Sequence, residues 1–180
     1  VDYRLVISFD REISYTFTCF LFCMRLPIQI EAILFKRTDG KIQYLILKRH
    51  PPKSHPEIGQ FWQPITGGLE EGETKMEALK REIREETGIK NIIKIIEDVR
   101  YYEPIDLSLI EYLKRHGHVC KHLKAYAFGV EVSSDEEVVL DRKEHSEFKW
   151  CSFQEALKLI RGTCYNHNES LKKLNEIVTK

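Results

Sequence analysis

One well-marked helix in the middle of the chain constrains the fold more than any other feature. Thr74 and Glu77 form a T-x-x-E pair, in which each side chain can cap a free backbone N–H group at the start of a helix. Gly88 follows where such a helix would end, because glycine readily takes the left-handed conformation that closes helices. We therefore predict a helix over residues 74–87. Three apolar residues form a stripe that would pack it on a sheet: Met76, Leu79 and Ile83.

The same helix carries three carboxylates on one face. Glu82, Glu85 and Glu86 are spaced i, i+3 and i+4, so their side chains lie within one turn of each other. Like charges at these spacings destabilise a helix by roughly 0.2 to 0.5 kcal/mol per pair, which favours a compensating cation. Clustered carboxylate oxygens suit Mg2+ or Mn2+. The alternative is a solvated charged face offset by nearby Lys and Arg side chains.

The wider segment favours the metal site. Gly67 is followed after five residues by Glu73, and after seven more by REIREETGI, which begins at Arg81 and ends at Ile89. This spacing resembles the Nudix box, GX5EX7REUXEEXGU with U apolar, at every specified position. The resemblance implies an α/β fold, a Nudix-type α/β/α sandwich with a mixed β-sheet, and a hydrolase of nucleoside diphosphates linked to another moiety.

The resemblance also implies a role for each residue of the box. Glu85 and Glu86 would be the main ligands of the divalent metal, and the Gly67 carbonyl an additional one. Glu82 would be a further ligand or the base that activates water. The remaining residues of the box would be structural: Glu73, Arg81 and Gly88. Of these, Glu73 and Arg81 would pair and so hold the loop against the helix.

Two segments outside the box narrow the resemblance. FWQPITGGLEEGE and EHSEFKW are similar to the dihydroneopterin triphosphate and dATP pyrophosphohydrolase branch, close to MutT-like enzymes. By that similarity Glu144 would be an extra metal ligand or a water activator, the alternative being a surface residue in a charged run. We interpret its neighbour His145 as a loop or cap residue in preference to a metal ligand. Lys48 and Arg49 would bind substrate phosphate, or else be charges that protect an edge strand.

These features predict Mg2+- or Mn2+-dependent hydrolysis of a nucleoside triphosphate-like substrate to a monophosphate and pyrophosphate. Pro104 and the tyrosine pair 101–102 leave open a dinucleoside polyphosphate or ADP-ribose hydrolase. A nucleotide-binding sensor without turnover is the alternative from another class, although every carboxylate of the box is present. We interpret the alternating His and Cys residues at 116–122 as a solvated basic loop, in preference to a zinc site.

The composition of the chain limits the kinds of binding partner that we expect. The chain has 28 basic and 28 acidic side chains among 180 residues, so no net charge favours nucleic acid or a membrane surface. The apolar run 15–24 has ten residues, far fewer than the ~20 that span a bilayer. Five scattered cysteines suit the reducing cytoplasm. We expect a small nucleotide-like substrate as the partner, and a monomer or homodimer.

The remaining pattern predicts strands on both sides of the central helix and more helices at the end. Residues 1–24 are interpreted as an N-terminal extension of uncertain status, and residues 25–180 as the hydrolase domain. The predicted strands are 28–35, 42–47, 92–96, 99–102, 125–132 and 147–150. Residues 61–66 are a short apolar segment that leads into Gly67 and Gly68. The predicted further helices are 153–160 and 170–178, with 107–114 as a short helix or loop.

Overall fold

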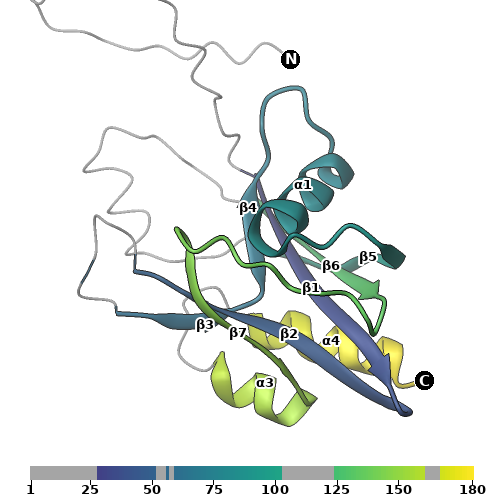
Figure 1. Ribbon diagram of the computed structural model, residues 1–180. Helices are drawn as coiled ribbons and strands as arrows, with labels where there is room; N and C mark the ends of the chain where they lie inside the picture. The colour runs from purple at the N-terminus through teal and green to yellow at the C-terminus, as the bar shows by residue number, and fades with distance from the viewer. Residues whose placement is uncertain (1–27, 52–55, 57–58, 103–123, 161–166) are drawn as a thin grey trace, which may run out of the picture.

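The computed structural model describes residues 28–51, 56, 59–102, 124–160 and 167–180 (Figure 1). The proposed extension, the 107–114 segment, Pro104 and the His and Cys residues at 116–122 lie outside these ranges. The strands are β1 (Ile28–Thr38), β2 (Lys41–Arg49), β3 (Phe61–Gln63), β4 (Ile65–Gly68), β5 (Ile92–Tyr102), β6 (Lys124–Val132) and β7 (His145–Cys151). The helices are α1 (Lys75–Thr87), α3 (Phe153–Leu159) and α4 (His167–Val178).

The strands form one mixed sheet with β1 at its centre. One edge of β1 pairs with β6 in parallel, and β6 pairs with β5 antiparallel. The other edge of β1 is shared, since β4 pairs with residues 29–32 and β2 with residues 35–38, both antiparallel. On β2, the strands β3 and β7 add further antiparallel pairs. The sheet therefore splits at β1, and the end of β4 comes to lie beside α1.

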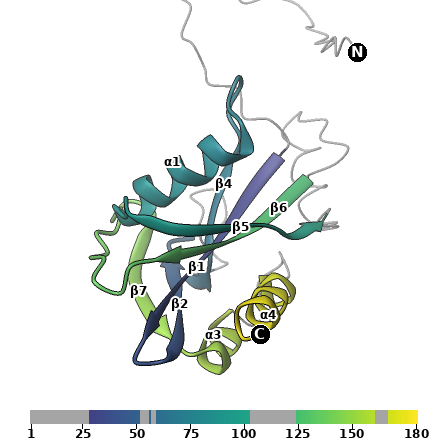
Figure 2. The same cartoon turned by 90° about the vertical axis from the view of Figure 1, so that its right-hand side faces the viewer.

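Helices cover both faces of this sheet, which confirms the predicted α/β/α sandwich. Because successive side chains of a strand point to opposite faces, β1 supplies two separate cores. Ile30 and Leu34 pack with Leu79 and Ile83 of α1 on one face. Ile33 and Phe35 pack on the other face, against α3 and α4. Figure 2 shows α1 on one side of the sheet and α3 and α4 on the opposite side.

The apolar segment 61–66 forms β3 and the start of β4, which are separated at Pro64 because proline has no N–H group for a sheet ladder. One strand prediction was wrong in its continuity. The two strands predicted at 92–96 and 99–102 are one strand, β5, whose register shifts between Ile96 and Arg100. Asp98 lies in that shift with a φ of 54°, so the strand bends without ending.

The packing of α4 depends on a glycine in β6. A Cβ atom added at Gly129 would overlap the Leu174 side chain, which is fully buried. We expect Gly129→Ala to lower the free energy of unfolding by about 1 to 3 kcal/mol, the usual effect of overpacking a core. Urea denaturation measures this change. In a Leu174→Ala background the same substitution should have a much smaller effect, and an equal effect in both backgrounds would contradict this packing.

No helix within the described ranges is both long and apolar enough to cross a bilayer.

Candidate active site

The helix α1 directs two of its three clustered carboxylates inward. Its capping box at Thr74 and Glu77 is formed, and Gly88 closes it in the left-handed conformation, with φ of 70°. Between these caps the helix is oriented so that Glu82 and Glu86 are buried, whereas the Glu85 side chain is 59% exposed. Buried carboxylates are rare unless a cation or hydrogen-bond donors accompany them. The burial of this pair therefore marks a site.

Arg81 connects the helix to the loop before it. Its Nε and Nη2 atoms donate to the two oxygens of Glu73, at 2.8 and 2.9 Å, and Nη2 also donates to the Gly68 carbonyl at 2.9 Å. Nη1 donates to Glu82 at 2.6 Å and to Glu85 at 3.2 Å. One guanidinium thus joins the loop and two helix carboxylates. Glu73 and Arg81, which were predicted to pair, are in direct contact.

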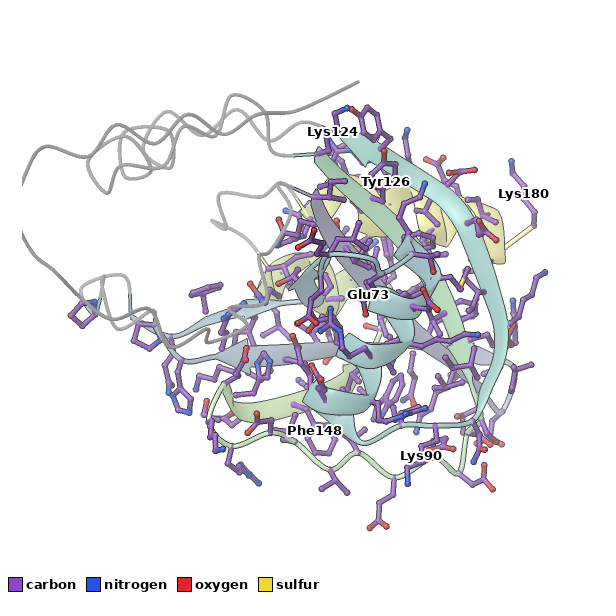
Figure 3. All side chains as sticks on the ribbon, turned by 90° about the horizontal axis from the view of Figure 1, so that it is seen from above. Glu73, Lys90, Lys124, Tyr126, Phe148 and Lys180 are labelled. Carbon is purple, nitrogen blue, oxygen red and sulfur yellow. The ribbon has the colours of Figure 1, made fainter. Side chains whose placement is uncertain are left out.

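Glycine at position 67 lets β4 approach the helix closely. Gly67 pairs with Ile30 of β1, and a Cβ atom at Gly67 would occupy the space of the Glu82 carboxyl group. The Gly67 backbone and the Glu82 side chain, both predicted near the metal, are therefore adjacent. In Figure 3, Glu73 marks the loop side of α1, with Tyr126 of β6 and Phe148 of β7 on opposite sides of it.

A loop far along the chain completes the site. Val139 N–H donates to the Thr87 carbonyl at 2.8 Å, and Asp141 N–H donates to the Glu86 carbonyl at 3.2 Å. These bonds hold the loop on the last turn of α1 and bring Glu144 toward Glu86. Ligand-type atoms of Glu86, Glu144 and His145 all lie within 4.8 Å of one another.

His145 is the residue that sequence reasoning missed. It is the first residue of β7 and is fully buried, and its Nε2 atom lies 2.8 Å from Oε2 of Glu86. The interpretation of His145 as a loop or cap residue was therefore wrong. The contact joins residues 59 apart, and no local pattern reports such a pairing. The only available signal was the proximity of His145 to Glu144 and to the strand that follows.

The structure separates the two cations predicted to bind phosphate. Arg49 lies at the site, where its Nη2 atom is 3.3 Å from Glu144 and its Nη1 atom is 3.5 Å from the Thr66 hydroxyl. Lys48 pairs with Glu147 at 2.7 Å and lies 5.8 Å from the centre of the Trp62 ring. Successive residues of a strand point to opposite sides, so only Arg49 faces the carboxylates.

Burial raises the pKa of two carboxyl groups at the site, whereas hydrogen bonds from a cation lower the pKa of a third. Burial raises the pKa of Glu82 above its usual range, although the Arg81 guanidinium opposes the shift. Burial also raises the pKa of Glu86, opposed mainly by the hydrogen bond from His145. The hydrogen bonds from Arg81 lower the pKa of Glu73. The buried pair is therefore poorly solvated as anions and favours a nearby cation.

The donor set fits a hard divalent cation. Oε1 of Glu86 is buried and, among the described residues, has no hydrogen-bond partner. The Glu144 carboxylate is close to it, and the exposed Glu85 carboxylate is on the same helix face. Oxygen donors of this kind match Mg2+ or Mn2+ better than softer metals. The arrangement can therefore hold a metal ion that contacts a phosphate group entering the site from solvent.

Comparison with known proteins finds a family, relatives and solved structures that this chain resembles. The family profile described as NUDIX domain matches residues 27–173. The dihydroneopterin triphosphate diphosphatase of Escherichia coli (strain K12) is 25% identical over 139 residues, which cover 76% of this chain and 85% of that protein. An RNA pyrophosphohydrolase of Bartonella bacilliformis is 28% identical over 133 residues, covering 68% and 75%. A solved Ap4A hydrolase complex from C. elegans superposes with a TM-score of 0.63 at 20% identity, covering 84% of this chain and 97% of that one.

Proposed function

The chain belongs to the Nudix domain family of hydrolases, and on this basis we propose that it hydrolyses a nucleoside triphosphate-like substrate to a monophosphate and pyrophosphate with Mg2+ or Mn2+. The observation that carries the proposal is the meeting of Glu144 with Glu86, which adds a carboxylate to the three on α1. Nudix hydrolases generally need divalent metal ions. The pyrophosphohydrolase activity of relatives on nucleotide-like substrates agrees with this site.

The surroundings of each carboxylate favour a particular chemical role for it. Glu86, Glu85 and the Gly67 carbonyl would hold the cation, which when bound neutralises phosphate charge and makes water a better nucleophile. Glu82 is tied to Arg81 and buried, so it suits a ligand or a supporting role. The Glu144 side chain is 45% exposed, so its carboxylate is accessible to solvent. We assign the acceptance of the water proton to Glu144.

Arg49 orients the other reactant. Its guanidinium lies between Glu144 and Thr66, and a planar fork of N–H donors fits phosphate oxygens. A phosphate held there would stand next to the proton acceptor and beside the carboxylates of α1. Positioning of this kind lowers the barrier of phosphate hydrolysis because the reacting groups are held together in advance.

Arg49→Gln is expected to lower kcat/KM for a triphosphate by about 10- to 100-fold, the range for loss of a charge-assisted hydrogen bond. Lys48→Gln is the matched control, since it removes the same charge one residue earlier on the side facing Glu147. It should change kcat/KM by less than about threefold, as for a surface ion pair. Steady-state kinetics with Mg2+ measures both variants. A larger effect of Lys48→Gln would reverse the assignment.

A turnover panel tests the proposed function. Purified protein with Mg2+ is given canonical and oxidised nucleoside triphosphates, dihydroneopterin triphosphate, ADP-ribose, diadenosine tetraphosphate and a 5′-triphosphorylated RNA oligonucleotide. Chromatography resolves the products. A triphosphate preferred by kcat/KM that yields pyrophosphate supports the proposal. Orthophosphate as the product, a preference for ADP-ribose or diadenosine tetraphosphate, or the absence of turnover on every substrate would contradict it.

A further inference from the structure

A buried histidine lies behind the carboxylate best suited to hold the cation. The His145 side chain is 0% exposed and that of Glu86 is 4% exposed, so neither contact atom is open to solvent. When Glu86 is ionised, as a ligand of a cation must be, its carboxylate can only accept hydrogen bonds, and the Nε2 atom of His145 then donates to Oε2 of Glu86. The 2.8 Å separation is that of a good charge-assisted hydrogen bond.

This bond distinguishes the two oxygens of Glu86. Oε2 is engaged by His145, whereas Oε1 has no partner within the described part of the chain. A carboxylate with both oxygens free can rotate about its last bond, and it then presents no fixed atom to a ligand. With Oε2 held, Oε1 is the atom left to bind a cation. Because Nε2 is already committed to Glu86, that nitrogen is unsuited to bind the cation itself.

The backbone fixes the histidine before any ligand arrives. His145 N–H donates to the Asp141 carbonyl at 2.9 Å, and Asp141 N–H donates to the Glu86 carbonyl at 3.2 Å. His145 also pairs with Arg49 of β2 in the sheet. The helix α1, the strand β2 and the loop before β7 therefore determine where the backbone of His145 lies. Such support is what keeps a ligand in its binding geometry.

We propose that His145 is a positioning residue, which holds Oε2 of Glu86 so that Oε1 is presented to the divalent cation. The proposal rests on the proposed function, because it assumes that Glu86 binds the catalytic metal. It adds a residue that is outside the Nudix box and is fully buried. Residues that hold metal ligands in this way typically change metal affinity or activity by 10- to 100-fold when replaced.

Two variants separate the hydrogen bond from the volume of the ring. His145→Phe keeps a ring of similar size without a donor, and His145→Gln keeps an N–H donor at a similar reach. Mn2+ is titrated into the full chain without substrate, and free Mn2+ is followed by electron paramagnetic resonance. His145→Phe should weaken Mn2+ binding by about 10- to 100-fold. His145→Gln should restore the affinity to within about threefold of the native protein, the scatter expected for a retained hydrogen bond.

Kinetics and spectroscopy complete the test. In the turnover assay with Mn2+ in place of Mg2+, His145→Phe should lower kcat at a fixed metal concentration and leave KM for the nucleotide unchanged. Pulsed spectra of the native protein with Mn2+ should show no directly bound nitrogen. Equal Mn2+ affinity in all three proteins would overturn the proposal, as would a directly bound nitrogen. The native spectrum does not depend on whether His145→Phe folds. Because Mn2+ binding needs no substrate, failure of the turnover panel would leave this result readable on its own.

Discussion

Replacing Glu86 by Gln is expected to reduce kcat by at least about a hundredfold, comparable to the loss of one preorganised charge-stabilising group from an active site. The substitution removes the negative charge and leaves the side chain nearly the same size. Oε2 of the native residue is held by His145, and the new amide oxygen can accept the same hydrogen bond. The fold should therefore persist while the site loses a cation ligand. Steady-state kinetics at saturating Mg2+ measures the change.

A matched control is available on the opposite layer. Glu176 lies on α4 and is exposed, so Glu176→Gln removes the same charge far from α1. Its kcat should equal that of the native protein. Thermal unfolding would show that both variants are folded. If Glu86→Gln retained full activity across a range of Mg2+ concentrations, the assignment of the metal site would be wrong.

Gly67→Ala is expected to lower kcat/KM by about a hundredfold or more, because displacement of a catalytic group by about 1 Å can have that effect. The added Cβ atom would overlap the Glu82 carboxyl group, which is the mobile end of its side chain. The carboxyl group would move and lose its 2.6 Å contact with Arg81. The damage should thus fall on activity more than on folding.

A double variant tests this explanation. Glu82→Ala removes the group that the new methyl meets, so Gly67→Ala should affect thermal stability less in that background than in the native one. Activity should stay low in the double variant, because Glu82 belongs to the site. Near-native activity of Gly67→Ala alone would show that β4 does not constrain the carboxylate.

Local patterns predicted the helix and most strands well. The helix predicted at 74–87 is observed at Lys75–Thr87, because its start and its end depend on residues of its own first and last turns. Leu171 and Leu174 of α4, three residues apart within the predicted helix 170–178, are both fully buried, because helical spacing alone determines which residues share a face. These features need no knowledge of distant parts of the chain.

Features that depend on distant contacts were harder to predict. The burial of His145 follows from the pairing of a late loop with α1, and its sequence neighbours do not report it. Lys48 and Arg49 looked equivalent in sequence, and their difference follows from the pairing of β2 with β7. The break at Pro64 was visible in principle, since proline within a strand signals an interruption.

The two separate cores described above have a consequence for how such a chain can evolve. Among the residues that the structure describes, no buried residue is shared between the core beneath α1 and the core beneath α3 and α4, although both rest on β1. Substitutions that repack the second core leave the carboxylates of α1 in place. Lineages can therefore diverge on that layer while selection preserves the chemistry on the other. Low sequence identity with a retained fold is the outcome that this division permits.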